Sequence, residues 1–157
     1  MAIVDIMDLP AALPPRTPVA GLDPGEKTLG VAISDLTLSI ASPLALIRRG
    51  KFTVEAEELF ALMAGRGAGG LIIGLPRNMD GTEGARCQSN RALARNLLRL
   101  RPDMPIAFWD ERLSTAAVER MLIRETDMTR ARRAEVVDKT AAAYILQGAL
   151  DRLRGGR

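Results

Sequence analysis

Apolar residues run without interruption through several short segments of the chain, and this pattern predicts a set of β-strands. Strands are expected at 19–23, 30–35, 71–76 and 106–109, each bounded by turn residues or an acid. A further strand is expected at 40–47, where Pro43 cannot donate a ladder bond and therefore favours an edge position. The run at 71–76 is typical of a strand that is buried on both faces.

Apolar positions repeat at three- and four-residue spacing in the segments that follow. This period predicts a helix that has Thr53 as its N-cap and ends at Gly65 and Gly67. Three more helices are expected, at 83–100, 115–124 and 135–153, with a polar, arginine-bearing connection over 127–133. The resulting order β-β-β-α-β-α-β-α-α predicts an α/β fold, with a five-stranded mixed sheet flanked by helices on both faces.

The start of the chain has a different composition. Its first 18 residues hold four prolines, namely Pro10, Pro14, Pro15 and Pro18. Because prolines fix the backbone and remove donors, we expect a flexible Pro-rich arm over 1–18. A chain of 157 residues has the usual size of one domain, which we place at 19–153, followed by a flexible tail over 154–157.

The composition of the chain excludes several classes of catalytic and metal-binding site. Histidine is absent and Cys87 is the single cysteine, which excludes Ser-His-Asp and Cys-His catalytic sites, histidine ligands and cysteine-rich zinc sites. No segment approaches the roughly 20 apolar residues of a membrane span, and the lone cysteine fits a reducing compartment, so we expect a cytoplasmic protein without membrane contact. A formal charge of +3 and a pI near 9.6 favour polyanionic partners.

Several acids lie where a site of an α/β sheet is expected to form. Asp23 ends a predicted strand, and Asp110 and Glu111 follow another. Ligands of open α/β sheets bind beyond the carboxyl ends of strands. Asp138 precedes small and apolar residues at helical spacings, so its carboxylate is expected on the apolar side of its helix. Acids from separate elements could therefore meet at one end of the sheet.

Clustered carboxylates point to divalent metal. A carboxylate that faces a core must be hydrogen-bonded, paired with a cation or bound to metal. Mg²⁺ or Mn²⁺ would neutralise such a cluster, activate a water and stabilise the leaving oxygen of a phosphodiester, without any histidine. Simpler roles stay open: a turn residue for Asp23, an ion pair with Arg112 for Asp110 or Glu111, and a first-turn helix acid for Asp138.

Four blocks of the sequence, in order, resemble motifs of the YqgF/RuvX family. They are GLDPGEKTLGVAISD at 21–35, GLPRNMDGTEG at 74–84, DERLST at 110–115 and DKTAAA at 138–143, and the similarity extends over 19–153. The resemblance implies an RNase H-like fold related to Holliday-junction resolvases. It also implies a nuclease that matures the 5′ end of pre-16S ribosomal RNA in ribosome biogenesis.

The resemblance assigns catalysis to Asp23, Glu111 and Asp138. With the argument from carboxylate chemistry, these three are the expected ligands of Mg²⁺ or Mn²⁺, and Asp110 is an additional candidate ligand. In the wider superfamily the second acid usually follows the fourth strand, where this chain has the segment 74–76, so Glu111 after the fifth strand must supply it. Thr28 occupies a position where family members usually carry arginine, which leaves Lys27 as the phosphate-binding candidate there.

Basic and polar residues near these acids are candidate nucleic-acid contacts. They are Lys27, Arg77, Asn78, Arg112, Arg130, Arg132 and Arg133. The loop with Arg77 and Asn78 could present donors to phosphate, although a plain left-handed turn would explain it as well. The arginines near Asp138 could hold a nucleic-acid backbone without reading its sequence, or form an ordinary solvated surface.

Other functions stay open at this point. A Holliday-junction resolvase acting on branched DNA would need a homodimer to cut symmetric strands; otherwise the chain could be a monomer or a homodimer. A nucleic-acid-binding factor without turnover would use the acids structurally. The run Asp23, Pro24, Gly25 followed by Gly30 also resembles the phosphate loop of actin-like ATPases, but those enzymes enclose nucleotide between two such domains and this chain has room for one.

Overall fold

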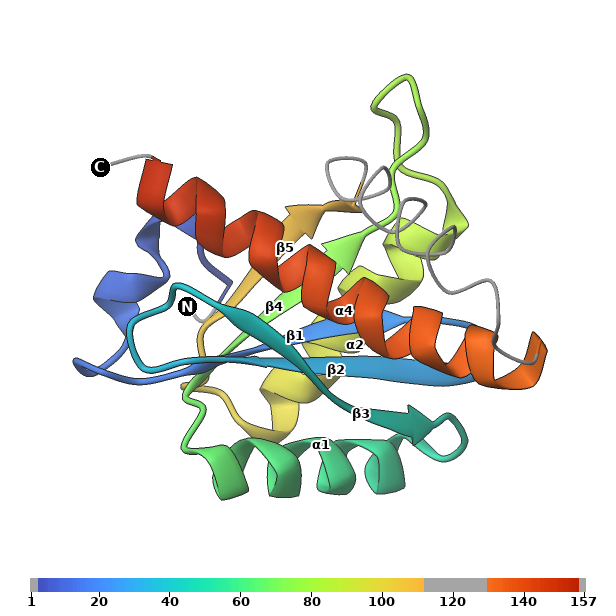
Figure 1. Ribbon diagram of the computed structural model, residues 1–157, viewed down its shortest axis with the longest axis horizontal. Helices are drawn as coiled ribbons and strands as arrows, with labels where there is room; N and C mark the ends of the chain where they lie inside the picture. The colour runs from blue at the N-terminus through green and yellow to red at the C-terminus, as the bar shows by residue number, and fades with distance from the viewer. Residues whose placement is uncertain (1–2, 112–129, 156–157) are drawn as a thin grey trace.

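Five strands form one mixed sheet in the order β3-β2-β1-β4-β5 (Figure 1). The computed structural model describes residues 3–111 and 130–155, with the side chains of the last segment described from Thr140 onward. The strands are β1 (Val19–Pro24), β2 (Thr28–Ser34), β3 (Ala41–Arg48), β4 (Gly70–Leu75) and β5 (Ile106–Asp110). The first three pair antiparallel, while β4 runs parallel to both β1 and β5.

The edge position that Pro43 favours is confirmed, because β3 is the outermost strand and pairs with β2. The pairing changes register beside the proline: Val31 lies opposite Ala45 and Ala32 lies opposite Pro43. The extra residue of β3 makes a local bulge, which is a usual place for a proline in a sheet.

Helices cover both faces of the sheet, as the order of elements predicts. α1 (Phe52–Arg66) and α2 (Ala85–Leu100) pack on one face, where the buried core includes Leu59, Leu97 and Ile73. α4 (Arg130–Gly155) lies across the other face, and its residues Leu146 and Leu150 are buried against the sheet. Two apolar layers therefore sandwich the strands (Figure 1).

The ends of α1 differ in how well the sequence predicted them. The helix ends at Gly67, whose φ of 68° is left-handed, as expected for a glycine C-cap. Its N-cap is Lys51 rather than Thr53, and no side chain of the cap bonds the first turn. The carboxylate of Glu55 instead bonds the chain before the helix, because its Oε2 accepts the backbone N–H of Gly50 at 2.8 Å. The expected cap at Thr53 is therefore wrong.

The prediction that the start of the chain stays outside the fold is wrong for residues 3–18. Ile3 forms a parallel bridge with Ile106, and the N–H of Val4 donates to the carbonyl of Ile106 at 2.9 Å, along the outer edge of β5. Two short 3₁₀ helices follow, at Ile6–Asp8 and Pro10–Ala12. Leu9 between them is fully buried in the cluster under α4. Apolar residues that mostly precede the first proline, Pro10, dock this segment.

The last helix is longer than predicted. α4 begins by Arg130 in the described part of the chain and reaches Gly155, so it includes residues assigned to the connection 127–133 and to the tail 154–157. The helix expected at 115–124 lies outside the described residues. Among the helices that the structure describes, none has both the length and the apolar character of a membrane span.

Candidate active site

Asp23 and Glu111 reach the same edge of the sheet because their strands run in the same direction. β1 is parallel to β4, with Leu22 opposite Ile73, and β4 is parallel to β5, with Leu75 opposite Asp110. The carboxyl ends of the three strands therefore lie side by side. Asp23 is near the end of β1, and Glu111 directly follows β5.

Gly74 leaves the space that the carboxylate of Glu111 fills. A Cβ atom built on Gly74 would lie 2.6 Å from Oε1 of Glu111 and 3.0 Å from Cδ1 of Ile145. The backbone of β4 is held at this point, because the buried amide of Asn90 donates to the carbonyl of Gly74 at 2.8 Å. Gly74 belongs to β4 and not to a loop. A side chain from the end of β5 thus occupies the volume above the end of β4.

The carboxyl groups of Asp23 and Glu111 share a hydrogen bond. Burial, together with the hydrogen bond and the negative charge of Asp23, raises the pKa of Glu111 from 4.5 to about 8. The charge of Asp110 also raises this pKa, whereas the guanidinium of Arg86 opposes the shift. Near neutral pH the pair therefore holds a proton between its two carboxyl groups.

Such a pair suits a hard divalent cation. Carboxylate oxygens are the ligands that Mg²⁺ and Mn²⁺ prefer, and a cation bound between them would remove the need for the shared proton. Within residues 3–111 and the described side chains of α4, no group of three metal-ligating side chains occurs. The assignment of Asp23 and Glu111 as metal ligands stays a prediction, as does that of Asp110.

Asp138 lies on α4, but its side chain is outside the described part of the structure. The helix approaches β1 closely at Gly21, where a Cβ would lie 2.8 Å from Cβ of Leu146 and 3.4 Å from the carbonyl of Ala142. Position 138 is one helical turn before Ala142. In Figure 1 the part of α4 that precedes this crossing runs over the loop between β1 and β2.

Arg77 and Asn78 hold the loop over 76–84 in shape. Arg77 pairs with Glu83 at 3.3 Å, and the side-chain amide of Asn78 donates to the hydroxyl of Thr82 at 3.0 Å. Gly81 has a φ of 89°, so the left-handed turn considered from the sequence is present. A contact of Arg77 or Asn78 with phosphate stays a prediction.

The structure says less about the other basic residues that the sequence predicted as nucleic-acid contacts. Lys27 is exposed in the turn between β1 and β2. Arg112 lies outside the described residues, and for Arg130, Arg132 and Arg133 the structure describes the helical backbone alone. These three arginines belong to α4 and not to the polar connection that the sequence predicted.

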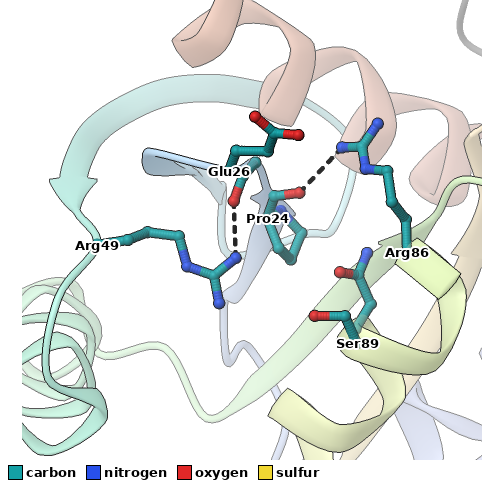
Figure 2. Close-up of a pocket in the computed structure, with 7 residues that line it drawn as sticks. Pro24, Glu26, Arg49, Arg86 and Ser89 are labelled. Atoms are coloured by element: carbon teal, nitrogen blue, oxygen red, sulfur yellow. Dashed lines mark hydrogen bonds between the residues drawn. The ribbon is translucent and has the colours of Figure 1, made fainter.

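Two arginines that were not among the predicted site residues bind the backbone directly after Asp23. Arg86 Nη2 donates to the carbonyl of Pro24 at 3.3 Å, and Arg49 Nη1 donates to the carbonyl of Gly25 at 2.7 Å (Figure 2). Arg86 could have been noticed, because it lies in the first turn of a helix, where the dipole favours acids and disfavours cations. Arg49 gave no such signal, since it simply follows a strand.

Comparison with known proteins identifies the family. A model of the RuvX family, described as a Holliday junction resolvase, matches residues 17–152. The chain belongs to the RuvX family. A RuvX relative from Phenylobacterium zucineum is 72% identical over 154 residues, which cover 98% of this chain and 99% of that protein. A relative from Caulobacter vibrioides (strain NA1000 / CB15N) is 68% identical over 155 residues, which cover 99% of each chain. Both relatives bear the name "Putative pre-16S rRNA nuclease".

A solved structure shows the same fold. It is T. thermophilus RuvC in complex with Holliday junction substrate, which matches with a TM-score of 0.55 and 16% sequence identity, over 88% of this chain and 96% of that one. At this identity the likeness concerns the fold, and it confirms the RNase H-like architecture. With nucleases as relatives across nearly its whole length, this RuvX chain is a hydrolase of phosphodiester bonds.

Proposed function

We propose that this RuvX chain is a metal-dependent nuclease that processes the 5′ end of pre-16S ribosomal RNA during ribosome biogenesis in the cytoplasm. The observation that supports it best is the hydrogen-bonded pair of Asp23 and Glu111 at the carboxyl edge of the sheet. Two partly buried carboxyl groups in contact are unfavourable unless a proton or a cation lies between them. An active site for phosphodiester hydrolysis accounts for the presence of two acids in contact at this edge of the sheet.

The residues have separate tasks in this proposal. Asp23 and Glu111, with Asp138 as the third acid, would hold Mg²⁺ or Mn²⁺, while Asp110 contributes negative charge nearby. Metal bound there would lower the pKa of a coordinated water and neutralise charge on the reacting phosphate. Gly74 leaves the space that the side chain of Glu111 occupies, and the positive charge of Arg86 partly offsets the negative charge of the acids.

The choice of substrate comes from the relatives. Those that share 72% and 68% of their residues with this chain are named for pre-16S rRNA, whereas the family description names Holliday junctions. RNA is therefore the first choice and branched DNA is the second. A resolvase would act as a homodimer, because it cuts two symmetric strands.

The test compares the wild type with Asp23→Asn and Asp138→Asn on a ribosomal-precursor RNA and on a four-way DNA junction, with Mg²⁺ or Mn²⁺. We expect cleavage of the RNA by the wild type and a loss of at least roughly 100-fold in each variant, since each removes a metal ligand. Asp103→Asn is the matched control, because Asp103 is an exposed acid between α2 and β5. It should cut at the wild-type rate.

Each other outcome points elsewhere. If both variants cut at the wild-type rate, the proposed metal site is wrong. If the wild type cuts only the four-way junction, the site belongs to a resolvase. Binding of RNA without metal-dependent cleavage would identify a non-catalytic binding factor. Tight binding and hydrolysis of Mg·ATP would instead support the relation to actin-like ATPases.

A further inference from the structure

A pocket beside the acid pair is lined by two arginines and has no role in the function proposed so far. Its volume is about 340 Å³. The lining residues come from the turn after β1, the end of β3 and the first turns of α2; they are Pro24, Gly25, Glu26, Arg49, Arg86, Ser89 and Asn90. Pro24 directly follows Asp23 in the chain, and the charge of the lining residue Arg86 acts on Glu111, so the pocket lies near the acid pair.

The two guanidinium groups approach the turn after β1 from different elements (Figure 2). Each is oriented by a backbone carbonyl, Arg49 by that of Gly25 and Arg86 by that of Pro24. A guanidinium carries five N–H donors in a fixed fork, so one bond to a carbonyl leaves it able to donate to a second acceptor. Phosphate is the ligand whose geometry this fork matches best.

Arg49 is held in place from behind. Its Nε lies 3.5 Å from Oε1 of Glu55, whose side chain is 6% exposed, and the other oxygen of Glu55 accepts the N–H of Gly50. The buried carboxylate fixes the arginine before any ligand arrives. A preorganised arginine loses little side-chain entropy on binding an anion.

Arg86 links the pocket to the chemistry. Its charge lowers the pKa of Glu111, so it lies within electrostatic reach of the acid pair. It is also in the first turn of α2, where the helix dipole favours an anion, and no acid occupies that turn. The carboxylate among the lining residues belongs to Glu26, which is exposed. An anion seated here would contact both a cation and a helix N-terminus.

We propose that the pocket between Arg49 and Arg86 binds a backbone phosphate of the substrate strand, next to the phosphodiester that the acids cleave. The inference rests on the proposed nuclease function, and it adds a phosphate subsite to it. Both arginines hold the same phosphate, which fixes the register of the strand without reading its sequence. Ser89, on α2, provides a hydroxyl at the side of the same pocket.

The test measures binding of a short fluorescein-labelled RNA single strand by anisotropy, over a series of salt concentrations and in EDTA. We expect Arg49→Gln and Arg86→Gln each to weaken binding roughly tenfold, since a charge-assisted hydrogen bond is lost. The slope of log affinity against log salt should become shallower by about 0.7 in the double variant, as for the loss of one phosphate contact on a single strand. Each single variant keeps one arginine on the phosphate and should lose less slope than the double variant.

Two further variants serve as controls for this binding experiment. Arg99→Gln removes an exposed arginine at the other end of α2, and it should retain the wild-type affinity and slope. Arg86→Lys keeps the charge but not the fork, so it should keep the slope and bind more weakly than the wild type. Thermal melting of every variant identifies any that fails to fold. If Arg49→Gln fails to fold, Arg49→Lys replaces it in the test.

The outcomes separate the subsite from the nuclease. Wild-type affinity and slope in both glutamine variants would overturn the subsite. A double variant that loses twice the slope of one phosphate contact would also overturn it, because that would mean two separate phosphates. Cleavage by the wild type with Mg²⁺ is measured in parallel. A wild type that binds but does not cut contradicts the nuclease proposal alone, and the slopes still decide the subsite.

Discussion

Glu111 carries an energetic cost that comes from its position. Its folded pKa of about 8 lies above the ordinary 4.5, so the folded protein binds a proton more tightly than the unfolded chain does. The favourable contribution of the protonated group is fully present below about pH 4.5 and is lost as the pH rises toward 8. Above that pH the metal-free protein keeps two charged carboxylates in contact.

Glu111→Gln should therefore stabilise the metal-free protein at alkaline pH. We expect a gain of about 2 kcal/mol near pH 9 in EDTA and little change near pH 4, because the neutral amide avoids the repulsion by Asp23. Chemical denaturation at both pH values measures the difference. Mg²⁺ should stabilise the wild type but not the variant, and an equal effect of Mg²⁺ on both would contradict the assignment of Glu111 as a ligand.

Gly74→Ala tests whether the space above β4 belongs to Glu111. The new Cβ would lie 2.6 Å from Oε1 of Glu111, so the carboxylate must move while the fold can persist. We expect cleavage to fall at least roughly tenfold, with a native circular-dichroism spectrum, since small displacements of catalytic groups are costly. Gly65→Ala is the control, because a Cβ on Gly65 meets no atom within 4 Å. Full activity in the Gly74 variant would refute this interpretation.

At the scale of elements, the contact between β1 and α4 determines where the last helix lies. Gly21 permits that contact, and a Cβ there would come within 2.8 Å of Cβ of Leu146, an atom close to the helix backbone. Neither atom can move without shifting a strand or a helix. The position of α4, and with it residue 138, therefore depends on a glycine in the sheet.

Gly21→Ala should destabilise the protein by about 1–3 kcal/mol, as overpacking of a core does. Urea denaturation measures the change, and Gly65→Ala again provides a control with an open environment. Activity per folded molecule should also fall, because a displaced α4 carries Asp138 with it. A melting curve identical to that of the wild type would show that the helix adapts without cost.

The elements themselves could be predicted because each is set by local patterns. The uninterrupted apolar run of β4, the proline of β3 and the glycine after α1 each act within a few residues, and each prediction agrees with the structure. The N-cap of α1 could not be predicted, because it is Lys51, whose side chain makes no capping bond and which is not a residue type that marks a helix start. Contacts such as Arg86 with Pro24 depend on tertiary packing and leave no local pattern.

At the scale of the whole molecule, the first residues complete the sheet. The segment over 3–18 covers the outer edge of β5 and places Leu9 in the core under α4, whereas the sequence suggested an arm because prolines outweighed scattered apolar positions. The dark-blue segment near the start of the chain and the end of α4 lie on the same side of the molecule, away from the end of β1 (Figure 1). The segment thus supports the fold at a distance from the acids.

Leu9→Ala should cost about 2–5 kcal/mol of folding free energy, the usual range for a fully buried leucine. Urea denaturation measures the loss, while cleavage measured well below the melting temperature should be unchanged. Met7→Ala, at a residue that is 36% exposed, is the control and should have a small effect. Equal stability of the Leu9 variant and the wild type would mean that the segment does not dock in solution.

The position of the Glu111 carboxylate above Gly74 has a consequence for how the acids of related chains are compared. An alignment judged column by column finds Gly74 and no acid at the end of β4. The volume above that column nevertheless contains a carboxylate, which arrives from the neighbouring strand. For chains of this fold, the inventory of acids is better taken by location in space than by position in sequence.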